Sequence, residues 1–134
     1  MSDNLRSEMM RAQNEYLKME RERASWLKTL EHNREENVFM KNCLAIIIRD
    51  SSDAKMLEQA EYYQNLFVNK DVTISLLKYD IAAQTGLANQ ENEITGHISR
   101  MLKKQCKLRT DMLKMDIEFR RLDMLFNDYM QNIM

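Results

Sequence analysis

Hydrophobic residues recur through most of the chain at alternating spacings of four and three, the repeat of helices that pack as coiled coils. The repeat is clearest in the last third of the sequence, where Gln105 is its polar member. This stripe, which we call a heptad seam, comprises Ile94, Ile98, Met101, Gln105, Leu108, Met112, Met115, Phe119, Leu122, Phe126, Tyr129 and Ile133. It predicts one long amphipathic helix with its apolar side turned toward a core.

Two further heptad seams precede it and contain more polar members. The middle of the chain carries Met56, Ala60, Tyr63, Phe67, Lys70, Ile74, Leu77, Ile81 and Gln84 on this spacing. The first third carries Leu5, Met9, Ala12, Tyr16, Met19, Arg23, Trp26, Leu30, Asn33, Asn37, Met40, Leu44 and Ile47. We therefore expect three helices, each with a coiled-coil seam.

The first interruption of the helical pattern is the sequence DSSD at residues 50–53. Ser51 or Ser52 can cap a new helix there, and Asp53 suits the positive end of that helix. The first two helices should therefore be joined by a short turn, which makes them antiparallel neighbours.

The second interruption runs from Thr85 to Asn89 and contains Gly86, a residue that commonly ends a helix. The third helix is expected to begin between Asn89 and Gly96. The predicted helices cover about residues 3 to 49, 53 to 85 and 90 to 133. Together they predict an all-α, up-down-up bundle that forms a single domain over residues 1 to 134.

The polar members of the three seams predict a polar layer inside the bundle. With Gly86 level with Tyr16 and a rise of about 1.5 Å per residue, Asn33, Lys70 and Gln105 reach the same height. Asn37 lies one turn above them. We favour a layer that fixes helix register, because a lysine with two amides is a poor metal-binding set. The alternative is a ligand or ion pocket at this level.

The middle helix has a second apolar line, on the side that a three-helix core leaves in water. Its members are Val68, Val72, Leu76, Tyr79 and Ala83. A helix that is apolar on two sides is normally covered on two sides, which favours self-association over scattered exposed residues. The expected partner is a second copy, most simply in a homodimer, or another helical protein.

The outer helices are longer than the middle one, so each is expected to overhang the bundle. About twelve N-terminal residues should project at one end and the segment after Asp123 at the other. The second segment is too apolar to stay in water, and we expect it to pack on a second copy, on Ile46 and Ile48, or on another protein. Its candidate interface residues are Met124, Leu125, Phe126, Tyr129, Met130 and Ile133.

Composition narrows the classes of function. The chain has no proline and two glycines, which excludes most glycine-dependent nucleotide sites. Its net charge of -1, from 20 basic and 21 acidic residues, gives no reason to expect a polyanion as the main partner. The exception is a basic helical face that could bind phosphates, and its residues are Arg100, Lys103, Lys104 and Lys107. A solvated face is the favoured interpretation, and nucleic-acid binding is not expected.

The residue types used in catalysis are few and scattered. His32 and His97 lie off the seams and lack the Glu-x-x-His spacing of di-iron bundles. Cys43 and Cys106 are roughly 20 Å apart along the predicted bundle, too far for a disulfide. We expect no enzymatic activity, no cofactor and no metal site.

The start of the chain is charged, and its longest strongly apolar run, Leu44 to Ile48, is far short of the roughly 20 residues that span a bilayer. A cytoplasmic protein without a membrane span is the expectation. The best-supported function class is an interaction or scaffold module that acts through protein contacts. A ligand- or metal-binding bundle and a phosphate-binding helix are the alternatives.

A loose resemblance covers residues 20 to 82. The stretch EYYQNLF at 61–67, followed by Lys70 and by LKYDI at 77–81, resembles a family of small bacterial helical proteins of unknown function. In that pattern a Trp-Leu pair, here Trp26-Leu27, comes earlier in the chain. The resemblance implies a cytoplasmic helical protein and brings no activity, cofactor or catalytic residue with it.

Overall fold

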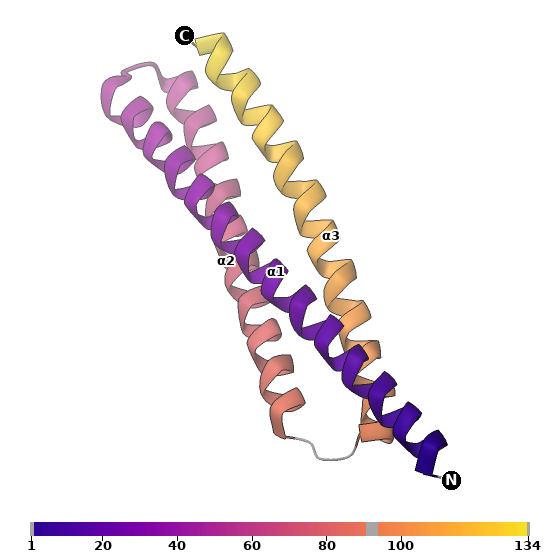
Figure 1. Cartoon of the computed structure of the whole chain (residues 1–134). Helices are drawn as coiled ribbons and strands as arrows, with labels where there is room; N and C mark the ends of the chain where they lie inside the picture. Colours follow the sequence, from indigo (N-terminus) through magenta and orange to yellow (C-terminus); the bar gives the residue numbers. More distant parts are fainter. Residues whose placement is uncertain (1, 91–93, 134) are drawn as a thin grey trace.

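The structure, a computed structural model, describes residues 2–90 and 94–133. It is an up-down-up bundle of three long helices, α1 (Ser2–Asp50), α2 (Ala54–Gln90) and α3 (Ile94–Ile133) (Figure 1). The α1–α2 turn and the C-terminus lie at one end of the rod, which we call the turn end, and the N-terminus lies at the other. Over the described residues the chain has no strand, so the predicted all-α architecture is confirmed.

The heptad seams form the core. Leu30 and Leu44 of α1, Phe67 and Ile81 of α2, and Met115 of α3 are almost completely removed from solvent. Each of these residues lies at a seam position, where the 3.5-residue repeat keeps one side of a helix against its neighbours. Burial of this stripe, rather than helix propensity alone, stabilises helices of such length.

The turn between α1 and α2 begins and ends with local hydrogen bonds. The Ser51 Oγ accepts a hydrogen bond from the Asp53 amide across 3.2 Å, and the Asp53 Oδ1 accepts one from the Lys55 amide across 3.0 Å. Asp53 is therefore the N-cap of α2, where Ser51 or Ser52 was expected. Its negative charge also suits the positive end of the helix.

The predicted end of the middle helix at Gly86 is wrong. Helix α2 continues through Gly86 to Gln90, and no described residue has a positive φ. A methyl group added at Gly86 would meet no atom within 4 Å, so packing does not require glycine there either. Helix α3 begins at Ile94, within the predicted interval between Asn89 and Gly96.

The predicted overhang at the C-terminus is also wrong. Phe126 and Tyr129 are buried, and their rings pack with Tyr63 and Phe67 of α2 at centroid distances of 4.8 to 5.7 Å. The Tyr129 hydroxyl donates to the Met56 carbonyl across 3.5 Å. Helix α2 ends and helix α3 begins four to five residues later in the sequence than expected. Helix α3 therefore starts further from the turn end, and its last residues stay level with the α1–α2 turn.

Four of the six candidate interface residues in this segment therefore belong to the bundle itself. Phe126 and Tyr129 are core residues, and Met130 and Ile133 are half-buried against the core. Only Met124 and Leu125 are exposed. They are the members of the predicted interface that remain available to another molecule.

The overhang at the N-terminus is confirmed. Residues 3–11 of α1 are exposed, and the first buried side chain of the helix is Ala12. Leu5 and Met9 continue the heptad seam of α1 into this segment, where both side chains are exposed. We call residues 3–11 the α1 overhang; it projects from the end of the rod opposite the turn end (Figure 1).

Candidate functional site

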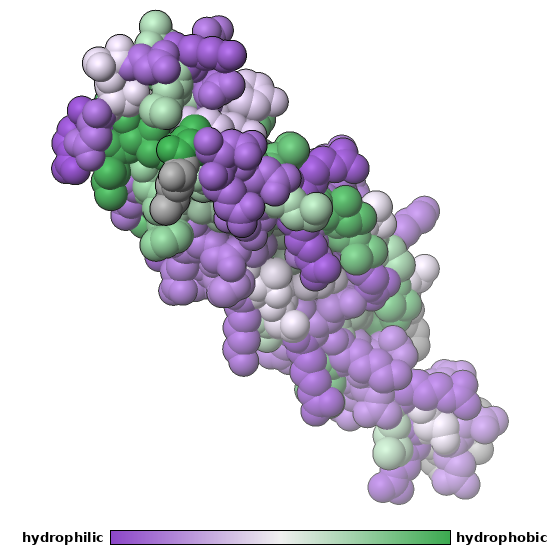
Figure 2. Space-filling model, turned by 90° about the horizontal axis from the view of Figure 1, so that it is seen from above, coloured by the Kyte–Doolittle hydropathy of each residue, from purple (hydrophilic) through white to green (hydrophobic). Residues whose placement is uncertain are grey.

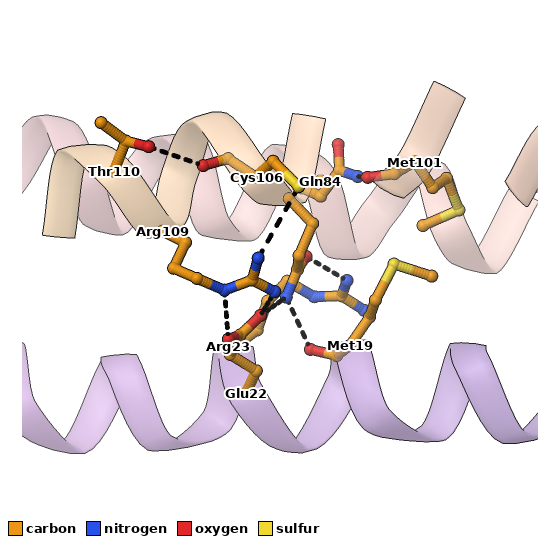
Figure 3. A network of polar contacts seen from close by, with 9 residues as sticks. Met19, Glu22, Arg23, Gln84, Met101, Cys106, Arg109 and Thr110 are labelled. Carbon is orange, nitrogen blue, oxygen red and sulfur yellow. Dashed lines mark hydrogen bonds and ion pairs between the residues drawn. The ribbon is translucent and has the colours of Figure 1, made fainter. Parts of the chain in front are cut away.

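The most extensive polar feature of the interior is a network around Arg23 of α1, which is only 4% exposed. Its Nε donates to the Thr85 hydroxyl of α2 across 3.0 Å, and its Nη1 donates to the Gln105 side-chain oxygen of α3 across 3.1 Å. The Gln105 Nε2 in turn donates to the Met19 carbonyl across 3.0 Å. One arginine thus connects all three helices. Figure 3 shows the part of this network that surrounds Met19, Glu22, Arg23 and Arg109.

The network reaches the surface through Glu22. The Gln105 Nε2 also donates to Glu22, which receives two further bonds of 2.7 Å from the Arg109 guanidinium. The Arg109 hydrogen bonds are the main reason why the pKa of Glu22 lies below its ordinary value, and the pairing raises the pKa of Arg109. Burial lowers the pKa of Arg23, which stays charged because arginine titrates far above neutral pH.

The prediction of a single polar layer is wrong. Gln105 lies at the level of Arg23, whereas the Asn33 Nδ2 donates to the sulfur of Met115 across 3.5 Å. Gln105 and Met115 are ten residues apart on α3, or about 15 Å along its axis. The predicted heights failed because Arg23, and not a residue near Tyr16, pairs with the end of α2.

Asn37 and Lys70 occupy the middle of the bundle and each has its own partner. The buried Asn37 Nδ2 donates to the Phe67 carbonyl and to Asp71, which also pairs with Lys41. Lys70, with a side chain 13% exposed, donates to Glu118 across 3.1 Å. The four predicted polar residues therefore divide between two levels, and their contacts run mainly to neighbouring helices, as register-fixing residues require.

The predicted apolar line of α2 is exposed along its whole length. Val68, Val72, Leu76 and Tyr79 are 45% to 72% accessible, and Ala83 is exposed as well. We define the α2 outer face as the exposed residues between Tyr62 and Leu87. They are Tyr62, Gln64, Asn65, Val68, Asn69, Val72, Ser75, Leu76, Tyr79, Asp80, Ala82, Ala83 and Leu87.

This face carries almost no charge. Asp80 is its only ionisable member besides the two tyrosines. The nearby charges of Asp71 and Lys78 point toward α1, where they pair with Lys41 and Glu31. A solvated helix face normally alternates charged residues with polar ones, so an uncharged face of this length is typical of a covered surface.

A groove between α1 and α3 opens near the turn end. It consists of two adjoining hollows of about 560 and 580 Å³, which share Cys43 and Met130 as lining residues. The first, the turn-end pocket, has apolar walls; its lining residues are Cys43, Ile46, Ile47, Asp50, Ser51, Ser52, Asp53, Met56, Met130 and Ile133. Figure 2 shows hydrophobic surface gathered at this end of the rod, at its upper left.

The second hollow is acidic. Glu35, Glu36 and Asp123 line it, together with His32, whose Nε2 lies 3.0 Å from Glu36. Burial and the nearby charge of Glu36 raise the pKa of Asp123. Neither hollow has a lysine or arginine in its lining, so the groove combines apolar walls with an acidic rim.

The basic residues Arg100, Lys103, Lys104 and Lys107 lie on the exposed side of α3. Lys107 pairs with Asp111 across 3.3 Å, which offsets part of the positive charge. The same helix also exposes Leu113 and Ile117, which sequence analysis missed. Their spacing of four residues places them on one side of the helix, and this periodicity could have identified them from the sequence.

The described side chains of the types used in catalysis and metal binding do not form a common site. Among the described residues no group of three or more His, Cys, Asp and Glu side chains could hold a metal ion, and the side chain of His97 lies outside them. Cys43 and Cys106 are both free thiols. Within residues 2–90 and 94–133, no helix is long and apolar enough to cross a membrane.

Comparison with known proteins identifies no relative. No family model, no curated protein and no solved structure matches the chain. The resemblance over residues 20 to 82 therefore stays a prediction, and the argument for function depends on the surfaces described above.

Proposed function

We propose that this protein is a non-enzymatic interaction module that pairs with a second copy of itself through the α2 outer face. The observation that carries the proposal is the nearly uncharged surface between Tyr62 and Leu87. Exposed apolar side chains in a continuous line lower the solubility of a monomer, and covering them gains roughly 25 cal/mol per Å². A cytoplasmic location fits this role and is part of the proposal.

A second copy suits this face because the face can pair with itself. Antiparallel pairing about a two-fold axis near Ser75 sets Val68 of one copy against Ala82 of the other, and it brings the two copies of Leu76 together near the axis. It also places the helix dipoles in opposite directions, which is the favourable arrangement.

The size of the face indicates how strong the pairing should be. A helix of this length offers a strip of about 39 by 10 Å, or roughly 400 Å² in projection. Standard interfaces bury about 800 Å² of accessible surface per partner, so the dimer belongs with the smaller ones. We therefore expect dissociation constants in the micromolar range or weaker.

Sedimentation equilibrium across micromolar to millimolar protein tests the proposal with two matched variants. Leu76→Glu places a carboxylate on the α2 outer face, and Leu113→Glu places one on α3 at a residue with the same 60% exposure. We expect the wild type and Leu113→Glu to approach the mass of a dimer. Leu76→Glu should remain a monomer over the same range. A wild-type protein that stays monomeric throughout, or a Leu76→Glu variant that still dimerises, would contradict the proposal.

A further inference from the structure

The solvent side of α3 differs in charge from the rest of the molecule. We define the α3 outer face as the exposed residues between Ser99 and Met124 at the three heptad positions furthest from the seam. They are Ser99, Arg100, Lys103, Cys106, Lys107, Thr110, Leu113, Lys114, Ile117, Arg120, Arg121 and Met124. Six of the chain's 20 basic residues lie on this face and none of its 21 acidic ones, so the remainder of the chain has an excess of acidic residues.

The acidic residues of this part of α3 lie beside the neighbouring helices. Glu118 pairs with Lys70 of α2 across 3.1 Å, and Asp123 lines the acidic hollow next to α1. Asp111 and Asp116 are half-buried on the same two flanks. The α3 outer face therefore has no carboxylate of its own.

Ion pairs neutralise part of the positive charge. Lys107 pairs with Asp111 across 3.3 Å, and Arg120 pairs with Asp116 across 3.1 Å. Both are pairs of residues four apart in which the basic side chain is 78% exposed, and such pairs contribute little. Residues 99–124 as a whole comprise eight basic and four acidic residues, so this part of α3 keeps a net positive charge.

Three large apolar side chains lie among these cations. Leu113 and Ile117 are each 60% exposed, and Met124 is 68% exposed. Lys114 and Arg121 lie three and four residues from Ile117, which places both beside it on the helix surface. Long basic side chains can lay their aliphatic stems along such a surface while their charged ends reach a polar layer.

We propose that the α3 outer face binds the surface of a bilayer that contains anionic lipid. Its six cations extend along about 38 Å and match a continuous layer of anionic headgroups, which attracts Lys and Arg. Leu113, Ile117 and Met124 enter the boundary between headgroups and acyl chains, as apolar residues do in helices that lie in the membrane interface. This mode of binding needs no membrane-spanning helix.

Lipid fits this face better than a nucleic acid does. Aromatic side chains that stack on bases, and Asn or Gln that read base edges, are absent from the α3 outer face. Exposed aliphatic side chains gain little against phosphates, whereas they gain free energy when the bilayer boundary covers them. A folded acidic protein would need a matching strip of the same length, which a bilayer supplies without shape complementarity.

Vesicle co-sedimentation at low salt tests the proposal with the whole chain, at protein concentrations below the range in which the α2 dimer forms. The vesicles contain phosphatidylserine and phosphatidylcholine in a one-to-two ratio, and vesicles of phosphatidylcholine alone are the control. The charge variant carries Lys103→Glu and Lys114→Glu. Its matched control carries Lys28→Glu and Lys55→Glu, which change the net charge equally at exposed sites of α1 and α2.

The wild type should bind only the anionic vesicles, and added salt should weaken the binding. One Lys or Arg near an anionic surface contributes about fivefold in affinity, so the charge variant should bind at least about twentyfold more weakly. The matched control should stay within about threefold of the wild type, because its substitutions lie more than a Debye length of about 10 Å from the bound face.

Leu113→Glu and Leu76→Glu separate this contact from the α2 dimer, because the two leucines are equally exposed on different helices. Leu113→Glu should bind vesicles at least about tenfold more weakly and still dimerise, whereas Leu76→Glu should still bind vesicles. A wild type that does not bind anionic vesicles, or a charge variant that binds like its control, would overturn the proposal. Binding of duplex DNA or polyglutamate without binding to vesicles would overturn it too, and each of these outcomes leaves the α2 dimer to its own test.

Discussion

Nη1 of Arg23 on α1 donates a hydrogen bond to Oε1 of Gln105 on α3 across 3.1 Å, inside the bundle. Both residues occupy seam positions, where an apolar side chain would pack with less desolvation cost. The pair can form only when the two helices have one relative height, because a shift of one turn moves the partners apart by about 5.4 Å. We infer that the pair selects the register of α3.

Truncation of the arginine should be costly. Arg23→Ala removes the bonds to Thr85 and Gln105 and the packing of the arginine stem, and we expect the free energy of unfolding to fall by about 2 to 4 kcal/mol. Arg21→Ala, two residues away at an exposed site, is the control and should change it by less than about 0.5 kcal/mol. Urea unfolding followed by circular dichroism measures both values.

The pairing itself is tested by a double-mutant cycle with Gln105→Ala. Hydrogen bonds to charged groups contribute about 1.5 to 3 kcal/mol, so we expect a coupling energy of at least about 1 kcal/mol between the two sites. Additive effects of the two substitutions would show that Arg23 and Gln105 act independently and would contradict a shared role in register.

The aromatic cluster at the turn end should contribute strongly to stability. Phe67 is fully buried, and its ring meets that of Phe126 edge to face at 5.1 Å. Phe67→Ala is expected to lower the free energy of unfolding by about 3 to 5 kcal/mol. Phe39→Ala is a matched control, because the Phe39 residue is 69% exposed and its loss should have little effect. Similar costs for the two substitutions would contradict the observed packing of α3.

Asp123 should make stability depend on pH. Burial and Glu36 raise the pKa of Asp123, so the folded state holds the proton more tightly than the unfolded state does. The free energy of unfolding should therefore fall as pH rises from about 3.8, the ordinary Asp value, through the raised value. Above the raised pKa, Asp123 is ionised in both the folded and the unfolded state, and the full free-energy cost of burying its charge lowers the stability.

Asp123→Asn removes this cost. At pH 7 the variant should be more stable than the wild type by less than about 1 kcal/mol, because solvent screens a half-buried carboxylate. The gain should disappear near pH 3 and shrink in a Glu36→Gln background, which removes one of the two causes of the shift. Urea unfolding at both pH values measures it, and a gain that is independent of pH would contradict this explanation.

The sequence predicted the helices and their buried sides well because both depend on local periodicity. The α2 outer face was also identified, since its line of apolar residues needs no knowledge of the other helices. The heights of individual residues along the bundle axis were harder to predict, because they depend on where α2 ends. Helix formation continued through Gly86 to Gln90, and this displaced both the polar layer and the end of α3 from their predicted levels.

Arg23 was the missed residue of most consequence. It interrupts an apolar seam, and a charge at such a position was the available signal. Its partners come from 62 and 82 residues away in the chain, so spacing within α1 could not identify them. The turn-end pocket was likewise not predictable, because its lining combines residues 43–56 with Met130 and Ile133, which are distant in sequence.

Pairing through the α2 outer face is tested most directly by the distance between equivalent sites in two copies. A nitroxide label at Ser75, with Cys43 and Cys106 replaced by serine, lies near the proposed two-fold axis, whereas a label at Thr110 lies on α3, away from it. Pulsed electron spin resonance at high protein concentration should give a short distance, below about two helix diameters of 10 to 12 Å each, for Ser75 alone. The absence of dipolar coupling at Ser75, or equal coupling at both sites, would contradict the α2 pairing.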